Sequence, residues 1–149
     1  MRFLAGLALL TGCGGPDAPA GGNQWRYSLA VPVDFKPEQV QGIDSAVARY
    51  RGPGAVLSLD HGMYGGAPTC SGTGCELVEE QLDGHRAVIG RFRFRPAEQQ
   101  GRGPFFVHVY VQLRRQPLEE GLEMRASCES QEACDRALAI FRTVLFERA

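Results

Sequence analysis

Four cysteines stand in two close pairs, and their spacing limits the chemistry open to them. Cys70 and Cys75 are five positions apart, and Cys128 and Cys134 are six apart. Neither pair has the C-x-x-C spacing of redox and zinc motifs, and no histidine lies close in sequence to either pair. The spacing therefore favours structural disulfides over a redox or metal site, and it leaves the connectivity open. A Cys128–Cys134 bond would brace the start of a following helix, and a Cys70–Cys75 bond would close a glycine-rich loop.

Three histidines offer imidazole groups for catalysis or metal binding. His61 directly follows Asp60, His85 follows a turn, and His108 lies within an apolar stretch. Adjacent residues of a strand point to opposite faces, so Asp60 and His61 are poorly placed to share a ligand. The chain has no H-E-x-x-H, G-x-S-x-G or Walker pattern. These observations favour a non-enzymatic protein without metal or cofactor; the alternative is a secreted hydrolase or metal-dependent enzyme that uses Asp60, His61 or His108.

The stretch 91–95 alternates arginine with phenylalanine. In a strand, Arg91, Arg93 and Arg95 would form a row of guanidinium groups on one face. Such a row could bind phosphate, a carboxylated polymer or anionic lipid headgroups. The simpler interpretation is a solvated outer face, with Arg91 paired to Glu76 and the two intervening phenylalanines in the core.

A long glycine-rich segment is a second candidate for recognition. Residues 62–74 include five glycines and Pro68, which indicates a loop. The connection from Asp60 to Cys75 is long for a hairpin loop. Such loops usually bind something or are disordered, and a disulfide would favour order. We expect His61 and Tyr64 to contribute to a recognition surface there.

Most of the remaining chain carries strand signals. Strands are expected at Trp25–Val31, Ile43–Arg51, Ala55–His61, Glu76–Leu82, His85–Arg95, Phe105–Leu113 and Leu122–Cys128. A loop or single helical turn is expected at Phe35–Gly42. The dipeptide at 83–84, Asp-Gly, tolerates the positive φ angles of a type I′ turn. That turn predicts a register with Glu76 opposite Arg91 and Val78 opposite Ile89.

One amphipathic helix is predicted from Ser130 to about Phe146. Six apolar positions fall on one stripe, and Ser130 is a suitable N-cap; they are Cys134, Ala137, Leu138, Phe141, Val144 and Leu145. The expected fold class is α+β, with an antiparallel β-sheet covered by this C-terminal helix.

Length and charge restrict the protein class. The 149 residues fit one domain with a hydrophobic core, predicted at 25–149. Sixteen basic residues balance seventeen acidic ones, which argues against nucleic-acid binding.

The N-terminus has the features of a secretory signal. Arg2 precedes the apolar run Leu4–Leu10, which is too short to span a bilayer. Residues 10–13, Leu-Thr-Gly-Cys, resemble the lipobox of bacterial lipoproteins. The resemblance implies cleavage of residues 1–12 and lipidation of Cys13, which would anchor the chain to a membrane. Gly14 differs from the aspartate that resembles an inner-membrane retention signal, which favours an outer-membrane destination.

Residues 13–24 then form a predicted flexible tether, rich in glycine, proline and alanine, with a reach of roughly 20 Å. Once Cys13 is lipidated, four cysteines remain, an even number suited to an oxidising compartment outside the cytoplasm. The expected location is therefore the cell envelope.

The order of elements, with the sequences at 27–32, around Val109 and at 139–144, resembles the Mog1/PsbP-type α+β sandwich. The two cysteine pairs of this chain depart from the pattern of that family. The resemblance implies a binding or assembly role, with an envelope protein as one possible partner.

Overall fold

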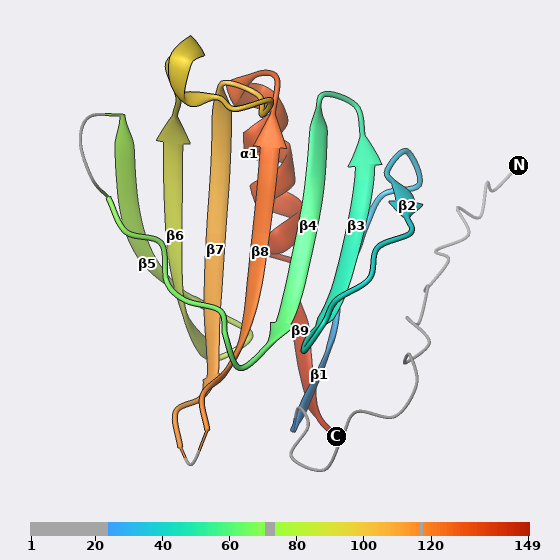
Figure 1. Cartoon of the computed structure of the whole chain (residues 1–149). Helices are drawn as coiled ribbons and strands as arrows, with labels where there is room; N and C mark the ends of the chain where they lie inside the picture. The colour runs from blue at the N-terminus through green and yellow to red at the C-terminus, as the bar shows by residue number, and fades with distance from the viewer. Residues whose placement is uncertain (1–23, 71–73, 117) are drawn as a thin grey trace, which may run out of the picture.

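Seven antiparallel strands form the main sheet of the protein, in the order β2-β3-β4-β8-β7-β6-β5 (Figure 1). The computed structural model describes residues 24–149 except 71–73 and 117; Cys13 and the predicted signal and tether up to residue 23 lie outside the described residues. The strands of the sheet are β2 (Lys36–Glu38), β3 (Ala46–Gly52), β4 (Ala55–Gly62), β5 (Cys75–Leu82), β6 (His85–Arg93), β7 (Phe105–Arg114) and β8 (Glu120–Cys128). The expected α+β class with an antiparallel sheet is confirmed.

A helix and two short strands lie against one face of this sheet, here called the helix side. The helix α1 (Gln131–Phe141) contacts β4, β7 and β8. The strands β1 (Trp25–Ser28) and β9 (Leu145–Arg148) pair with each other as a separate two-stranded sheet. Figure 1 shows α1 behind the main sheet, at the middle of its width.

The core forms where alternating strand residues meet the apolar stripe of α1. The side chains of Leu57, Val109 and Met124 come from β4, β7 and β8, and each is fully buried. They belong to the same core cluster as Leu138 and Phe141 of the helix. The predicted alternation of β7 is confirmed, because its odd-numbered residues face this core. Apolar burial at about 25 cal/mol per Å² makes this layer the main source of stability.

The Asp83-Gly84 hairpin has the predicted geometry. Asp83 has a φ of 48° and Gly84 a φ of 80°, as a type I′ turn requires. Glu76 lies opposite Arg91, and Val78 opposite Ile89. Because a one-residue slip would move every side chain to the other face, this turn determines which residues of β5 and β6 face the core.

The predicted helix to Phe146 is too long. The helix ends at Phe141, and Leu145–Arg148 forms β9 instead. The hydroxyl of Thr143 donates to the carbonyl of Ile140 and accepts the backbone N–H of Ala30, which ties the turn to the segment after β1. Asp83 accepts the N–H of Phe146 at 2.7 Å. These long-range bonds and the pairing with β1 outweigh the helical periodicity, and Leu145, expected on the apolar stripe, is 57% exposed.

Smaller differences concern strand ends. The first strand stops at Ser28 rather than Val31, and the third begins at Ala46 rather than Ile43. The region expected to be a loop or helical turn contains β2, which pairs with β3 at the edge of the sheet. Strand ends depend on pairing with distant partners, which local sequence does not report.

The segment 63–70 crosses the face opposite the helix, here called the loop side. Figure 1 shows it as the green trace from the end of β4 toward β5. A Cβ atom added at Gly65 would come 3.3 Å from the ring of Tyr110, and one added at Gly90 would come 2.9 Å from Pro68. The segment therefore packs closely on β6 and β7.

Two disulfides link Cys70 to Cys75 and Cys128 to Cys134, with Cα–Cα distances of 5.7 and 5.4 Å. The first ties the crossing segment to the start of β5, and the second ties the end of β8 to α1. In the described part of the chain, no helix is both long and apolar enough to cross a membrane.

Candidate functional site

The arginine row predicted at 91–95 divides between the helix side and solvent. Arg91 lies in register with Val107, and Arg93 with Phe105. Both β7 residues belong to the odd-numbered row that faces the helix side. The intervening phenylalanines therefore point to the loop side. The interpretation that placed them in the core is wrong, because the core is on the face that carries the arginines.

Each of these arginines has a different environment. Arg91 pairs with Asp135 of α1 at 2.6 Å rather than with Glu76. The guanidinium of Arg93 lies 5.6 Å from the ring centroid of Phe105, a cation–π distance. Arg95 follows the end of β6, and its side chain is 78% exposed.

An aromatic cluster on the loop side was not expected from the sequence. Phe92, Phe94 and Phe106 lie with ring centroids 5.9–6.2 Å apart. The exposed Arg102 lies over Phe94 at 4.8 Å and over Phe106 at 5.6 Å. The alternation of Arg and Phe did predict two faces, but the partners Arg102 and Phe106 come from the next strand and its preceding turn.

Together Arg93, Arg95 and Arg102, with the rings of Phe94 and Phe106, form what we call the arginine end. It lies where β6 ends and β7 begins, beside the 3₁₀ turn Pro96–Glu98. Arginine over an aromatic ring keeps its charge and its planar donor fork exposed to ligands. This end can therefore bind anionic groups.

A groove on the helix side adjoins the arginine end. Its cavity volume is about 350 Å³, and its lining includes Arg91, Arg93, Phe105, Gln131 and Asp135. It lies between the start of β5, the end of β6, the start of β7 and the N-terminal part of α1. The volume is within the range of small-molecule sites.

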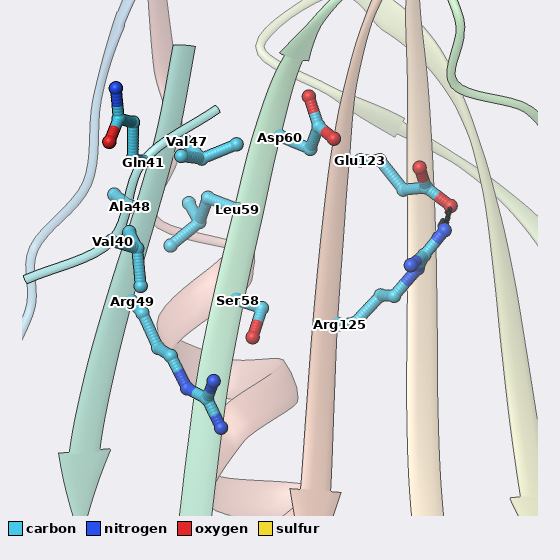
Figure 2. Close-up of a pocket in the computed structure, with 10 residues that line it drawn as sticks. All are labelled: Val40, Gln41, Val47, Ala48, Arg49, Ser58, Leu59, Asp60, Glu123 and Arg125. Carbon is cyan, nitrogen blue, oxygen red and sulfur yellow. Dashed lines mark hydrogen bonds and ion pairs between the residues drawn. The ribbon is translucent and has the colours of Figure 1, made fainter. Parts of the chain in front are cut away.

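A second hollow lies on the loop side between β3, β4 and β8 (Figure 2). Its cavity volume is about 220 Å³. Asp60 and Glu123 lie in register on neighbouring strands, and the side chains of Glu123 and Arg125 extend away from Asp60 and meet each other (Figure 2). Val40 and Val47 form its apolar side.

Glu123 connects this hollow to His108. Its carboxylate accepts a hydrogen bond from Nε of Arg125 at 2.9 Å and lies 2.7 Å from Nε2 of His108, although that contact is not aligned as a hydrogen bond. Burial would raise the pKa of Glu123, but these two basic partners outweigh it and lower the pKa. Burial and the hydrogen bond to Glu119 raise the pKa of the neighbouring Tyr110.

His61 lies on the helix side, opposite in direction to Asp60 as predicted. It is 4% exposed, and its Nε2 lies 3.1 Å from the fully buried carboxylate of Glu120. Burial lowers the pKa of His61, against the opposing effect of Glu120. Tyr27 packs edge-on against the ring, and burial raises the pKa of Tyr27 to about 12.

The residues predicted for recognition do not form one surface. Tyr64 is 79% exposed on the crossing segment, whereas His61 is buried on the other face. His85 packs edge-on between Trp25 and Phe146. Within residues 24–70, 74–116 and 118–149, no three His, Cys, Asp or Glu side chains are grouped to hold a metal ion.

Comparison with protein-family models and with curated proteins gives no match for this chain.

Proposed function

We propose that this chain is a lipid-anchored lipoprotein of the bacterial cell envelope, and that its domain is a non-enzymatic binding domain whose arginine end binds an anionic envelope component. The supporting observation is the placement of the two ends of the domain. Trp25, which follows the predicted tether, is held by Glu120 at the first residue of β8. Arg93 lies beside Phe105, which pairs with Cys128 at the last residue of β8.

Eight residues of extended strand separate these positions, a distance of about 27 Å. In a domain tethered through Trp25, the arginine end would therefore lie at the end of β8 that is remote from the attachment point. This placement favours a ligand or partner elsewhere in the envelope over the headgroups of the anchoring bilayer. The predicted outer-membrane destination remains part of this proposal.

A Mog1/PsbP-type fold is also part of the proposal. The contacts of α1 with β4, β7 and β8 support a sheet covered by a C-terminal helix. The additional β1–β9 pair and the two disulfides are features that this resemblance does not account for. Fold likeness gives no more than a general expectation of a binding or assembly role.

An enzyme that uses Asp60, His61 or His108 has less support. A hydrolase needs a nucleophile in contact with its base. Of the serines near His108, Ser58 lies two strands away with Arg125 between, and Ser127 accepts the backbone N–H of Gly103. His108 contacts Glu123 instead.

The anchor can be tested by metabolic labelling. Labelled palmitate should enter the wild-type protein and not a Cys13→Ser variant. A wild-type protein that carries no label, with its first methionine retained, would contradict the lipoprotein part of the proposal.

Binding at the arginine end can be tested by photo-cross-linking in cells. A photoreactive amino acid replaces Arg95 in one variant and Arg26, an exposed residue of β1, in the other. Position 95 should give specific adducts that position 26 does not. Equal adducts from both positions, or none from position 95, would contradict the proposed binding end.

A further inference from the structure

The groove beside the arginine end contains one cationic group that no carboxylate neutralises. Arg91 pairs with Asp135 at 2.6 Å and has Glu76 as its cross-strand neighbour. Among the described residues, no carboxylate lies within 4 Å of the guanidinium of Arg93. Arg93 therefore has its charge and its bidentate donor geometry available for an anionic group.

The rest of the lining is suited to a ring that carries hydroxyl groups. Phe105, which is only partly buried, supplies an apolar wall against which the C–H face of a sugar ring can pack. Gln131 offers both a donor and an acceptor, and the carboxylates of Glu76 and Asp135 are acceptors for hydroxyl groups. A few polar groups beside an apolar wall are typical of small-molecule sites.

The acidic residues also limit how much negative charge a ligand can carry. Glu76 and Asp135 would repel a nucleic acid or a polyphosphate, whose charges are closely spaced. A ligand with one anionic group and several neutral polar groups avoids this repulsion. The groove therefore fits a ring with one anionic group better than a polyanion with a continuous charged backbone.

Both disulfides lie beside this groove. Cys75 begins β5 at one side of it, and Cys134 lies in the first turn of α1 at the other. Gly74 accepts the N–H of Arg93 at 2.8 Å, which connects the Cys75 region to the strand that carries the guanidinium. Covalent bracing of both walls lowers the cost of ordering the site when a ligand binds.

We propose that the groove binds a saccharide ring that carries a carboxylate or phosphate, with the anionic group on Arg93 and the ring against Phe105. This inference rests on the proposed binding role of the domain. It goes further by naming the ligand chemistry and by assigning the two disulfides to the rigidity of the site.

The test uses the full-length lipidated protein, purified in a non-ionic detergent without a sugar headgroup. Isothermal titration calorimetry is carried out with galacturonate as the carboxylated probe, glucose 6-phosphate as the phosphorylated probe and maltotriose as the neutral probe. The matched variants are Arg93→Ala, in the groove, and Arg26→Ala, an exposed arginine of β1 at the other end of the domain.

At least one anionic saccharide should bind, and maltotriose should bind at least about tenfold more weakly, because it lacks the charge-assisted hydrogen bonds. The Arg93→Ala variant should lose about tenfold or more in affinity, while Arg26→Ala should stay within about twofold of wild type. Arg93→Lys should fall between them, since an ammonium group lacks the planar fork. Whether galacturonate or glucose 6-phosphate binds more tightly identifies the anionic group.

The proposal is wrong if neither anionic saccharide binds, if maltotriose binds equally well, or if the two alanine variants behave alike. Such results would leave the photo-cross-linking at position 95 unaffected. Adducts at that position together with a negative titration would disprove the saccharide ligand and retain the binding role.

Discussion

Replacement of Glu120 by alanine should destabilise the domain more than any exposed charge deletion. The carboxylate is fully buried, and its two oxygens accept the backbone N–H groups of Gln24 and Trp25 at 3.0 Å each. The same carboxylate lies 3.1 Å from His61 and 3.7 Å from Arg114. Glu120 therefore attaches the start of β1 to the main sheet.

The magnitude follows from the interactions that the substitution removes. Removal of one partner from a buried ion pair costs about 3–5 kcal/mol, and a hydrogen bond to a charged acceptor contributes about 1.5–3 kcal/mol. Gln24 is exposed, so its N–H can turn to water, whereas the side chain of Arg114 is only 15% exposed. We expect Glu120→Ala to lower the free energy of unfolding by about 3–5 kcal/mol, which for a domain of this size lowers Tm by roughly 10–20 °C.

Urea denaturation followed by tryptophan fluorescence measures this directly, because Trp25 is the single tryptophan and contacts the site. Glu120→Gln should lose about half as much, since the amide oxygen still accepts a hydrogen bond. Glu147→Ala removes an exposed carboxylate of β9 and should change stability by no more than about 0.5 kcal/mol. A loss below about 1 kcal/mol for Glu120→Ala would refute the view that this carboxylate secures β1.

Three further predictions concern pH, the end of the helix and a disulfide. Burial lowers the pKa of His61, so as the pH falls below about 6.5 the unfolded chain takes up a proton before the folded chain does. The free energy of unfolding, measured by urea titration, should therefore fall between pH 7 and pH 5. An equal fall with pH in the His61→Gln variant would contradict this. Leu138→Ala should lower the free energy of unfolding by about 2–5 kcal/mol in thermal denaturation, because Leu138 is 1% exposed. Leu145→Ala should lower it by about 0.5 kcal/mol or less. Similar losses of stability in the two variants would contradict the observed end of α1. Loss of the Cys128–Cys134 bond in a double alanine variant should cost about 2 kcal/mol in guanidinium denaturation, through greater freedom of the unfolded chain, and unchanged stability would count against that bond.

The strand pattern could be predicted well where side-chain alternation and turn chemistry agree. The Asp83-Gly84 turn specifies the register of β5 and β6 because its positive φ angles leave few alternatives. Ser130 accepts the N–H of Ala133 at 3.1 Å, as its N-cap role requires. Both features depend on interactions within a few residues.

The candidate site was predicted in part. The alternation at 91–95 correctly separated arginine from phenylalanine, but it could not identify which face holds the core. The face that holds the core is set by β7. Val107 lies in register with Arg91, and it packs in the core cluster with residues of α1. The aromatic cluster, the contact between Arg102 and Phe94, and the groove all require residues that are distant in sequence.

Local physical chemistry accounts for the antiparallel strands, the hairpin register and the start of the helix, since each depends on backbone preferences or side-chain spacing within one segment. It also predicts two cysteine pairs, which the fold brings to bonding distance. The end of the helix, the β1–β9 pair, the position of Glu120 beneath Trp25 and the groove at Arg93 depend on contacts between segments far apart in the chain. Their energies arise only when packing excludes water from those contacts, so no local pattern in the sequence could have indicated them.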